Sequence, residues 1–141
     1  HETQGGPGVV HGMLDYPEFY KVGVSHMPHD ARLMSASMWG DMYEGKSRTQ
    51  SGFPESKAEK LQGKLLLMLG MLDTTVPPAS VFRIVDALQA ANKDFDLLLL
   101  PNMEHWFSGY STRRGWDYLV QHLSGEVPPN EFRLSGVFGM D

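Results

Sequence analysis

The sequence predicts an α/β fold, a short parallel sheet with helices on its flanks. Two unbroken apolar runs, residues 65–69 and 97–100, are typical of strands that are covered on both faces, as in a parallel sheet. Between them, apolar residues recur at the spacing of a helix, so strand, helix and strand follow one another as in a parallel βαβ unit. In such folds, functional side chains lie at the carboxyl ends of the strands.

The first predicted strand is short and lies near the N-terminus. Residues 22–24 form an apolar, β-branched run that follows a turn-like segment and stops before Pro28. The stretch over residues 34–60 is mixed in character, rich in Ser, Gly and charge, and predicts a short helix among surface loops.

Two longer strands follow. The second strand, residues 64–69, ends at Gly70, and the third, residues 96–100, ends at Pro101. Glycine and proline both interrupt regular structure, so the loops after these strands are where the chain turns at the edge of the sheet. We therefore expect a parallel sheet of three strands.

Two helices are predicted from apolar spacing. The first spans residues 77–92 and starts at two prolines, which suit a first helical turn. The second spans residues 111–123 and stops before Gly125. The residues expected to share one face are Val81, Ile84, Val85 and Leu88 in the first helix, and Trp116, Leu119, Val120 and Leu123 in the second.

Composition limits the classes of function. A chain of 141 residues with 41% hydrophobic content can form one domain with a packed core. The formal net charge of -5 gives no electrostatic basis for nucleic acid or an anionic membrane as a partner, and no apolar run is long enough to span a bilayer. The lack of cysteine excludes disulfides, thiolate zinc sites and a Cys nucleophile. No feature indicates a compartment.

Asp73 and His105 are the first candidates for a functional site. Each follows the carboxyl end of a predicted strand, and the two strands are neighbours. An imidazole that accepts a proton and a carboxylate that fixes its tautomer are two parts of a catalytic triad. On local sequence alone, however, Asp73 also suits a turn or helix cap before the proline-led helix, and His105 also suits a half-buried loop position.

Six segments of the chain follow one another in a distinctive order: residues 16–25, 70–78, 86–88, 92–97, 101–105 and 113–118. This order resembles the end of the S9 serine peptidases, of the prolyl-oligopeptidase and dipeptidyl-peptidase IV type. The resemblance implies the C-terminal half of an α/β-hydrolase fold, with peptide bonds as substrate and no cofactor. It also implies that Asp73 is the triad acid and His105 the triad base, in the chain order Ser, Asp, His.

The nucleophile position departs from the family pattern. The G-x-S-x-G-G turn of the family falls on residues 1–6, where Gly5 and Gly6 match but Thr3 stands in place of the serine. The methyl group of Thr3 restricts its side-chain rotamer and crowds a turn that is already strained. The resemblance therefore predicts a site whose nucleophile is impaired.

Three further positions differ from the family. Leu69 replaces a common His, the pair Thr74 and Thr75 replaces an acidic residue and Asn, and Trp106 replaces the glycine after the His. The oxyanion donor and the propeller domain of relatives lie in upstream segments, and the chain, which begins without Met, is expected to lack that N-terminal portion. Turnover by these residues alone is therefore not expected.

Two other kinds of site were weighed. The glycines and proline of residues 5–8 match the spacing of neither a P-loop nor a dinucleotide fingerprint, which argues against a nucleotide cofactor. His26, His29 and Asp30, with His11 as a fourth ligand, have a spacing that could hold zinc, although a surface loop commonly carries such histidines without metal. We expect no metal.

The predicted function is that of a serine-type peptidase domain fragment, inactive alone, over residues 1–129, with an extension over residues 130–141. The alternatives are a non-catalytic pseudo-hydrolase that binds or scaffolds, and a hydrolase of small esters, because one fold supports many acyl-transfer reactions. The strand at residues 22–24 would lack a neighbour in such a fragment, so we expect a homodimer formed through that edge or the exposed sheet face, or pairing with the missing N-terminal portion.

Overall fold

The computed structural model describes residues 2–29 and 54–134, except for the side chains of residues 2–5, 54 and 55. In chain order the elements are α1 (Glu2–Asp15), β1 (Val22–His26), the short helix η2 (Pro54–Lys60), β2 (Lys64–Gly70), α3 (Pro78–Ala90), β3 (Asp96–Leu100), α4 (Gly109–Leu119) and η3 (Val120–Ser124). The predicted Asp30 and most of residues 34–60 lie outside the described residues.

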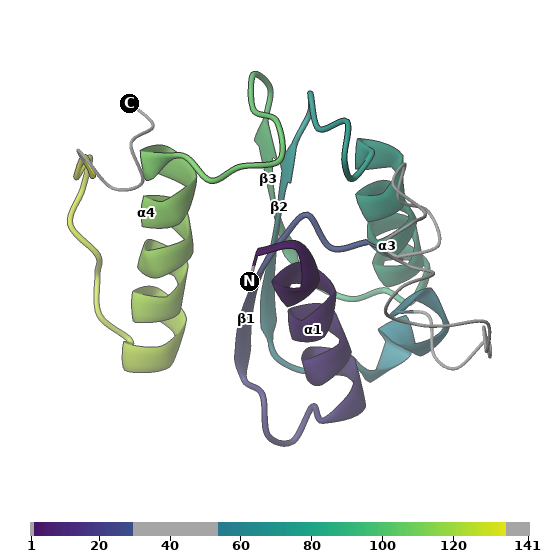
Figure 1. Cartoon of the computed structure of the whole chain (residues 1–141). Helices are drawn as coiled ribbons and strands as arrows, with labels where there is room; N and C mark the ends of the chain where they lie inside the picture. The colour runs from purple at the N-terminus through teal and green to yellow at the C-terminus, as the bar shows by residue number, and fades with distance from the viewer. Residues whose placement is uncertain (1, 30–53, 135–141) are drawn as a thin grey trace.

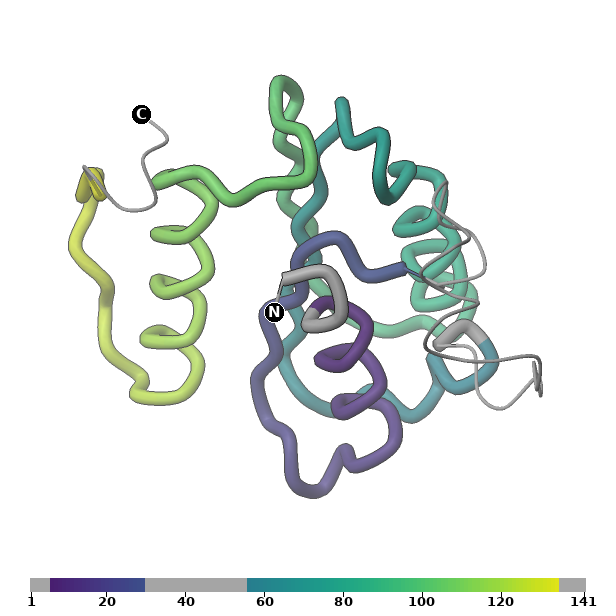
Figure 2. The backbone as a smooth tube through the Cα atoms, viewed as in Figure 1, coloured from purple at the N-terminus to yellow at the C-terminus, as the bar shows by residue number. Residues whose placement is uncertain are grey.

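The three strands form one parallel sheet in the order β1-β2-β3, as predicted. The register places Val22 beside Lys64, and Leu66 beside Asp96. Helices α1 and α3 cover one face of this sheet and α4 lies on the other face (Figure 1). The chain after α4 then runs back along that helix (Figure 2). This is the layered α/β architecture that the sequence predicts.

The main core lies between the sheet and the helices α1 and α3. Strand β2 is buried along almost its whole length, which explains its unbroken apolar sequence. Its alternate side chains point to opposite faces, so Leu65 and Leu67 join the core under α1 and α3, while Leu66 and Met68 pack on the side of α4.

Helix α1 was not predicted from the sequence. Its glycines and the internal Pro7 are poor helix formers. The helix nevertheless buries Val10, Met13 and Leu14 in the main core, and these three positions have helical spacing. Tertiary burial of this stripe outweighs the low propensity of the rest of the segment.

The prediction of which face of α4 is buried was wrong. Trp116 is 54% exposed and Leu123, in the following turn, is 63% exposed. The residues of α4 that are buried are Ser111, Gly115 and Tyr118. A side chain at Gly115 would lie 3.3 Å from Val24, so the lack of a side chain at this position allows the helix to approach β1.

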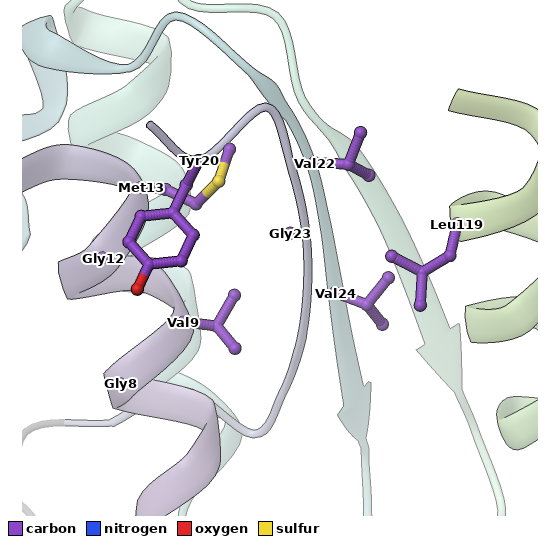
Figure 3. A pocket seen from close by; sticks show the side chains of 9 residues that line it. All are labelled: Gly8, Val9, Gly12, Met13, Tyr20, Val22, Gly23, Val24 and Leu119. Atoms are coloured by element: carbon purple, nitrogen blue, oxygen red, sulfur yellow. The ribbon is translucent and has the colours of Figure 1, made fainter. Parts of the chain in front are cut away.

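The outer edge of β1 lies open within the described part of the chain. The backbone carbonyl of Lys21 accepts from the N–H of Lys64, and the backbone N–H of Met27 donates to the carbonyl of Met68. The backbone groups of the odd-numbered residues therefore bond to β2. Because the backbone groups of successive strand residues point to opposite sides, those of Val22 and Val24 point outward. A groove of about 490 Å³ runs along this edge between α1 and α4 (Figure 3).

We propose that a second copy of the chain pairs with this edge, because unpaired strand edges favour such pairing. Val24→Pro removes an outward N–H without touching the bonds to β2, so it should convert a dimer into a monomer in light scattering at micromolar concentration. Leu99→Pro, which removes an outward N–H at the opposite edge, on β3, is the matched control and should leave the dimer intact. A monomeric unmodified chain would overturn the proposal.

In the described ranges, no helix is both long enough and apolar enough to cross a bilayer.

Candidate active site

Two loops meet at the carboxyl ends of β2 and β3. The chain after β3 passes so closely over Gly70 that any side chain there would collide with the carbonyl oxygens of Met103 and Glu104. The backbone N–H of Leu72 donates to the Met103 carbonyl at 2.9 Å, which joins the two loops. This close crossing places the residues after β2 beside those after β3.

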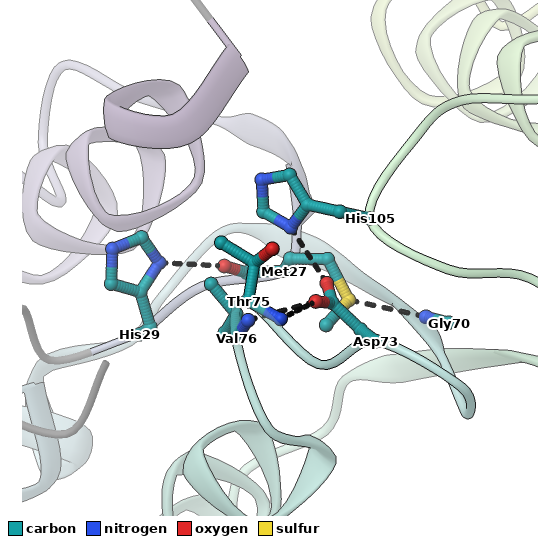
Figure 4. Close-up of polar contacts among 7 residues, drawn as sticks. All are labelled: Met27, His29, Gly70, Asp73, Thr75, Val76 and His105. Atoms are coloured by element: carbon teal, nitrogen blue, oxygen red, sulfur yellow. Dashed lines mark hydrogen bonds and ion pairs between the residues drawn. The ribbon is translucent and has the colours of Figure 1, made fainter. Parts of the chain in front are cut away.

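Asp73 joins the turn after β2 to His105. One carboxylate oxygen, Oδ1, accepts from the backbone N–H of Thr75 at 2.7 Å and of Val76 at 2.8 Å. The other oxygen, Oδ2, lies 2.6 Å from Nδ1 of His105 (Figure 4). The Asp73 side chain has no exposed surface, so its two oxygens are held by one turn and one imidazole. Asp73 therefore caps the turn and contacts the histidine at the same time.

The contact with Asp73 determines the tautomer of His105. A carboxylate oxygen only accepts, so Nδ1 carries the proton and Nε2 keeps its lone pair. The His105 side chain is 11% exposed, and its Nε2 points away from Asp73 (Figure 4). A neutral imidazole with a free Nε2 beside a carboxylate is the arrangement that a general base requires.

The third predicted position, Thr3, is placed by its backbone alone. It lies in the first turn of α1, and its side chain is outside the described residues. One turn later, Gly6 packs directly against the carbonyl oxygen of His26, the last residue of β1. The start of α1 therefore lies at the same end of the sheet as the loops of Asp73 and His105.

Residues 4–126 match the family model described as the prolyl oligopeptidase family, Peptidase_S9. The chain belongs to the prolyl oligopeptidase family. Its fold is that of the α/β-hydrolases. The catalytic roles of Asp73, His105 and Thr3 and the domain division at residue 129 remain predictions.

Individual proteins are also similar to this chain. A protein of Yersinia pestis that carries the provisional name carboxymethylenebutenolidase is 26% identical over 113 residues, which cover 71% of this chain and 42% of the relative.

Two solved structures share the fold. A protein of Bacteroides ovatus, provisionally named dipeptidyl aminopeptidase IV, has a TM-score of 0.72 at 24% identity over 86% of this chain and 18% of its own. A puromycin-hydrolyzing peptidase of Mycobacterium tuberculosis has a TM-score of 0.69 at 20% identity over 88% and 22%. This member of the prolyl oligopeptidase family thus spans less than half the length of these proteins.

The histidines that were considered as zinc ligands have different neighbours. His11 lies on α1, 3.9 Å from Asp15, whereas Nδ1 of His29 donates to the carbonyl oxygen of Met27 at 3.0 Å. Within residues 2–29 and 54–134, no three side chains of the metal-binding types come together as a site. Asp30 lies outside the described residues.

His26 is a site residue that sequence reasoning missed. It was weighed only as a metal ligand, but it is a buried residue at the end of β1, and its ring stacks on Phe107 with 4.1 Å between ring centroids. Burial, and then the electrostatic interaction with His105, lower the pKa of His26 from 6.5 to about 4, while the Asp73 carboxylate acts in the opposite direction. The alternation of β1, which puts His26 on the same face as two valines, was the available signal.

We expect the stability of the chain to fall in acid because of His26. The folded state binds a proton at His26 more weakly than the unfolded state, so this contribution is complete above pH 6.5 and is lost as the pH falls towards 4. The loss should be about 2 kcal/mol, measured by urea unfolding at pH 7 and pH 4.5. His26→Phe, which keeps a buried ring, should lose correspondingly less over this range. Equal losses in the two proteins would contradict the assignment.

Proposed function

We propose that this chain supplies the acid and base of a hydrolase that cleaves peptide bonds by acyl transfer. The observation that carries the proposal is the contact of 2.6 Å between His105 Nδ1 and the buried Asp73 carboxylate. Membership of the prolyl oligopeptidase family supports the reaction class, and the peptidase named among the solved structures supports peptides as substrates.

In the proposed reaction, His105 Nε2 takes the proton of the attacking hydroxyl group as a bond forms between that oxygen and the substrate carbonyl carbon. The same nitrogen then returns the proton to the leaving amine as the peptide bond breaks. Water attacks the resulting ester in a second round, with His105 again as base. Asp73 stays ionised, holds the tautomer and stabilises the imidazolium that forms between these steps.

The attacking hydroxyl group in this reaction would come from Thr3. Thr3 stands at the nucleophile position, and its extra methyl group hinders approach to a carbonyl carbon. We therefore expect the hydroxyl of Thr3 to react slowly or not at all, and a serine at the same position to react much faster.

The test is labelling with a fluorophosphonate, which traps activated hydroxyl groups, read by intact mass and by peptide mapping. We expect the Thr3→Ser variant to be labelled at residue 3 and the unmodified chain to be labelled far more slowly. His105→Ala combined with Thr3→Ser is the matched control and should abolish labelling. If neither the unmodified chain nor Thr3→Ser is labelled, the catalytic proposal fails and the chain is a non-catalytic member of the family.

A further inference from the structure

His26 is a buried polar residue that the proposed reaction does not use. It is the last residue of β1 and only 7% exposed, and its Nε2 has no hydrogen-bond partner among the described residues. By strand alternation its side chain lies on the same face as those of Val22 and Val24, towards α4. Burying a polar ring on an otherwise apolar face costs free energy, so we expect the ring to have a function.

The ring of His26 contacts the loop that carries His105. It stacks on Phe107, two residues beyond His105, with the planes inclined by 30°. The loop is held at its start, where the carbonyl of Met103 accepts from the backbone N–H of Leu72. It is held at its end by Ser108, which forms the capping box at the start of α4. Between these two anchors, the stack on Phe107 is a contact that joins the loop to β1.

The side chain next to His105 in the sequence gives it little support. Trp106 meets the His105 ring edge-on at 5.9 Å but is itself 55% exposed, so it has little surrounding structure to hold it in place. The contact with Asp73 fixes one end of the imidazole, and the backbone that carries the imidazole must be fixed separately. Phe107, by contrast, is partly buried against the cluster between the sheet and α4, so it is better anchored than Trp106.

An uncharged His26 ring is also compatible with its position next to the loop of His105. Burial and the nearby His105 oppose its protonation, so the stacked ring carries no charge at neutral pH. A second positive charge next to His105 would disfavour the imidazolium that the proposed reaction forms there. A neutral aromatic ring therefore supports the loop without opposing its chemistry.

We propose that His26 is a positioning residue, whose ring holds Phe107 and thereby sets His105 against Asp73. This inference rests on the proposed function, in which His105 is the base. The contact it predicts can nevertheless be measured without any reaction, through the strongly deshielded proton that a short hydrogen bond between imidazole and carboxylate gives in proton NMR. That signal is assigned to His105 by its loss in His105→Gln.

Four proteins are compared at pH 7. The unmodified chain and His26→Phe, which keeps a ring on Phe107, should both show the deshielded proton. His26→Ala should lose it through exchange with water, while Val22→Ala, on the same face of β1 but about 13 Å away along the strand, should keep it. If His26→Ala does not fold, Phe107→Leu removes the stack from the other side and should also lose the signal.

An unchanged signal in folded His26→Ala, or in folded Phe107→Leu, would overturn the inference, and so would loss of the signal in His26→Phe. Circular dichroism of each variant shows whether it is folded. Because this readout needs no nucleophile, a chain that resists fluorophosphonate but shows the expected NMR pattern would refute the proposed function and retain the positioning role.

Discussion

Asp73→Ala is expected to destabilise the chain by about 3–5 kcal/mol. The substitution removes the acceptor of two backbone N–H groups, of which that of Val76 belongs to a fully buried residue, and also the partner of His105. Each donor left buried without an acceptor costs about 1–3 kcal/mol. Urea unfolding monitored by circular dichroism measures the loss.

Asp73→Asn separates the structural role of this residue from its chemical role. The amide oxygen can still accept from Thr75 and Val76, so stability should fall by only about 1–2 kcal/mol. The amide nitrogen would face Nδ1 of His105 and force the other tautomer, which costs about 10⁴-fold in triad enzymes. In the Thr3→Ser background, Asp73→Asn should therefore fold but resist fluorophosphonate. Labelling at an undiminished rate would refute the role of Asp73 as the triad acid.

Gly6→Ala is expected to destabilise the chain by about 2–3 kcal/mol. A methyl group at Gly6 would overlap the carbonyl oxygen of His26 and lie 3.2 Å from that of Met27, and both belong to backbone that cannot move independently of the sheet. Helix α1 would have to lift from β1, which also stretches the buried bond of 2.7 Å from the Ser25 hydroxyl to the Gly6 carbonyl.

Gly8→Ala is the matched control on the same helix. No atom lies within 4 Å of a methyl group at Gly8, and alanine is the better helix former, so this variant should gain about 0.5–1 kcal/mol. Opposite signs at two positions in one helix would show that the cost at Gly6 is steric. If Gly6→Ala proved as stable as Gly8→Ala, α1 would not be packed against the end of β1 as described.

The proximity of Asp73 and His105 could be predicted because strand ends can be read from apolar runs. Gly70 and Pro101 end two such runs, and Asp73 and His105 follow them, so the topology of a parallel sheet brings them to one edge. His26 could not be assigned in the same way. Its surroundings depend on Phe107, which lies 81 residues later in the sequence, and local patterns contain no information about that stack.

By itself, the sequence determined the α/β class, the three parallel strands and the positions of α3 and α4, because long apolar runs and helical periodicity reflect burial directly. It also determined the resemblance to the family. The tertiary structure alone decided that a segment rich in glycine becomes α1, because burying Val10, Met13 and Leu14 outweighs weak helix propensity. It likewise decided which face of α4 meets the sheet, because α4 approaches Val24 at Gly115, where no side chain keeps the helix and the strand apart.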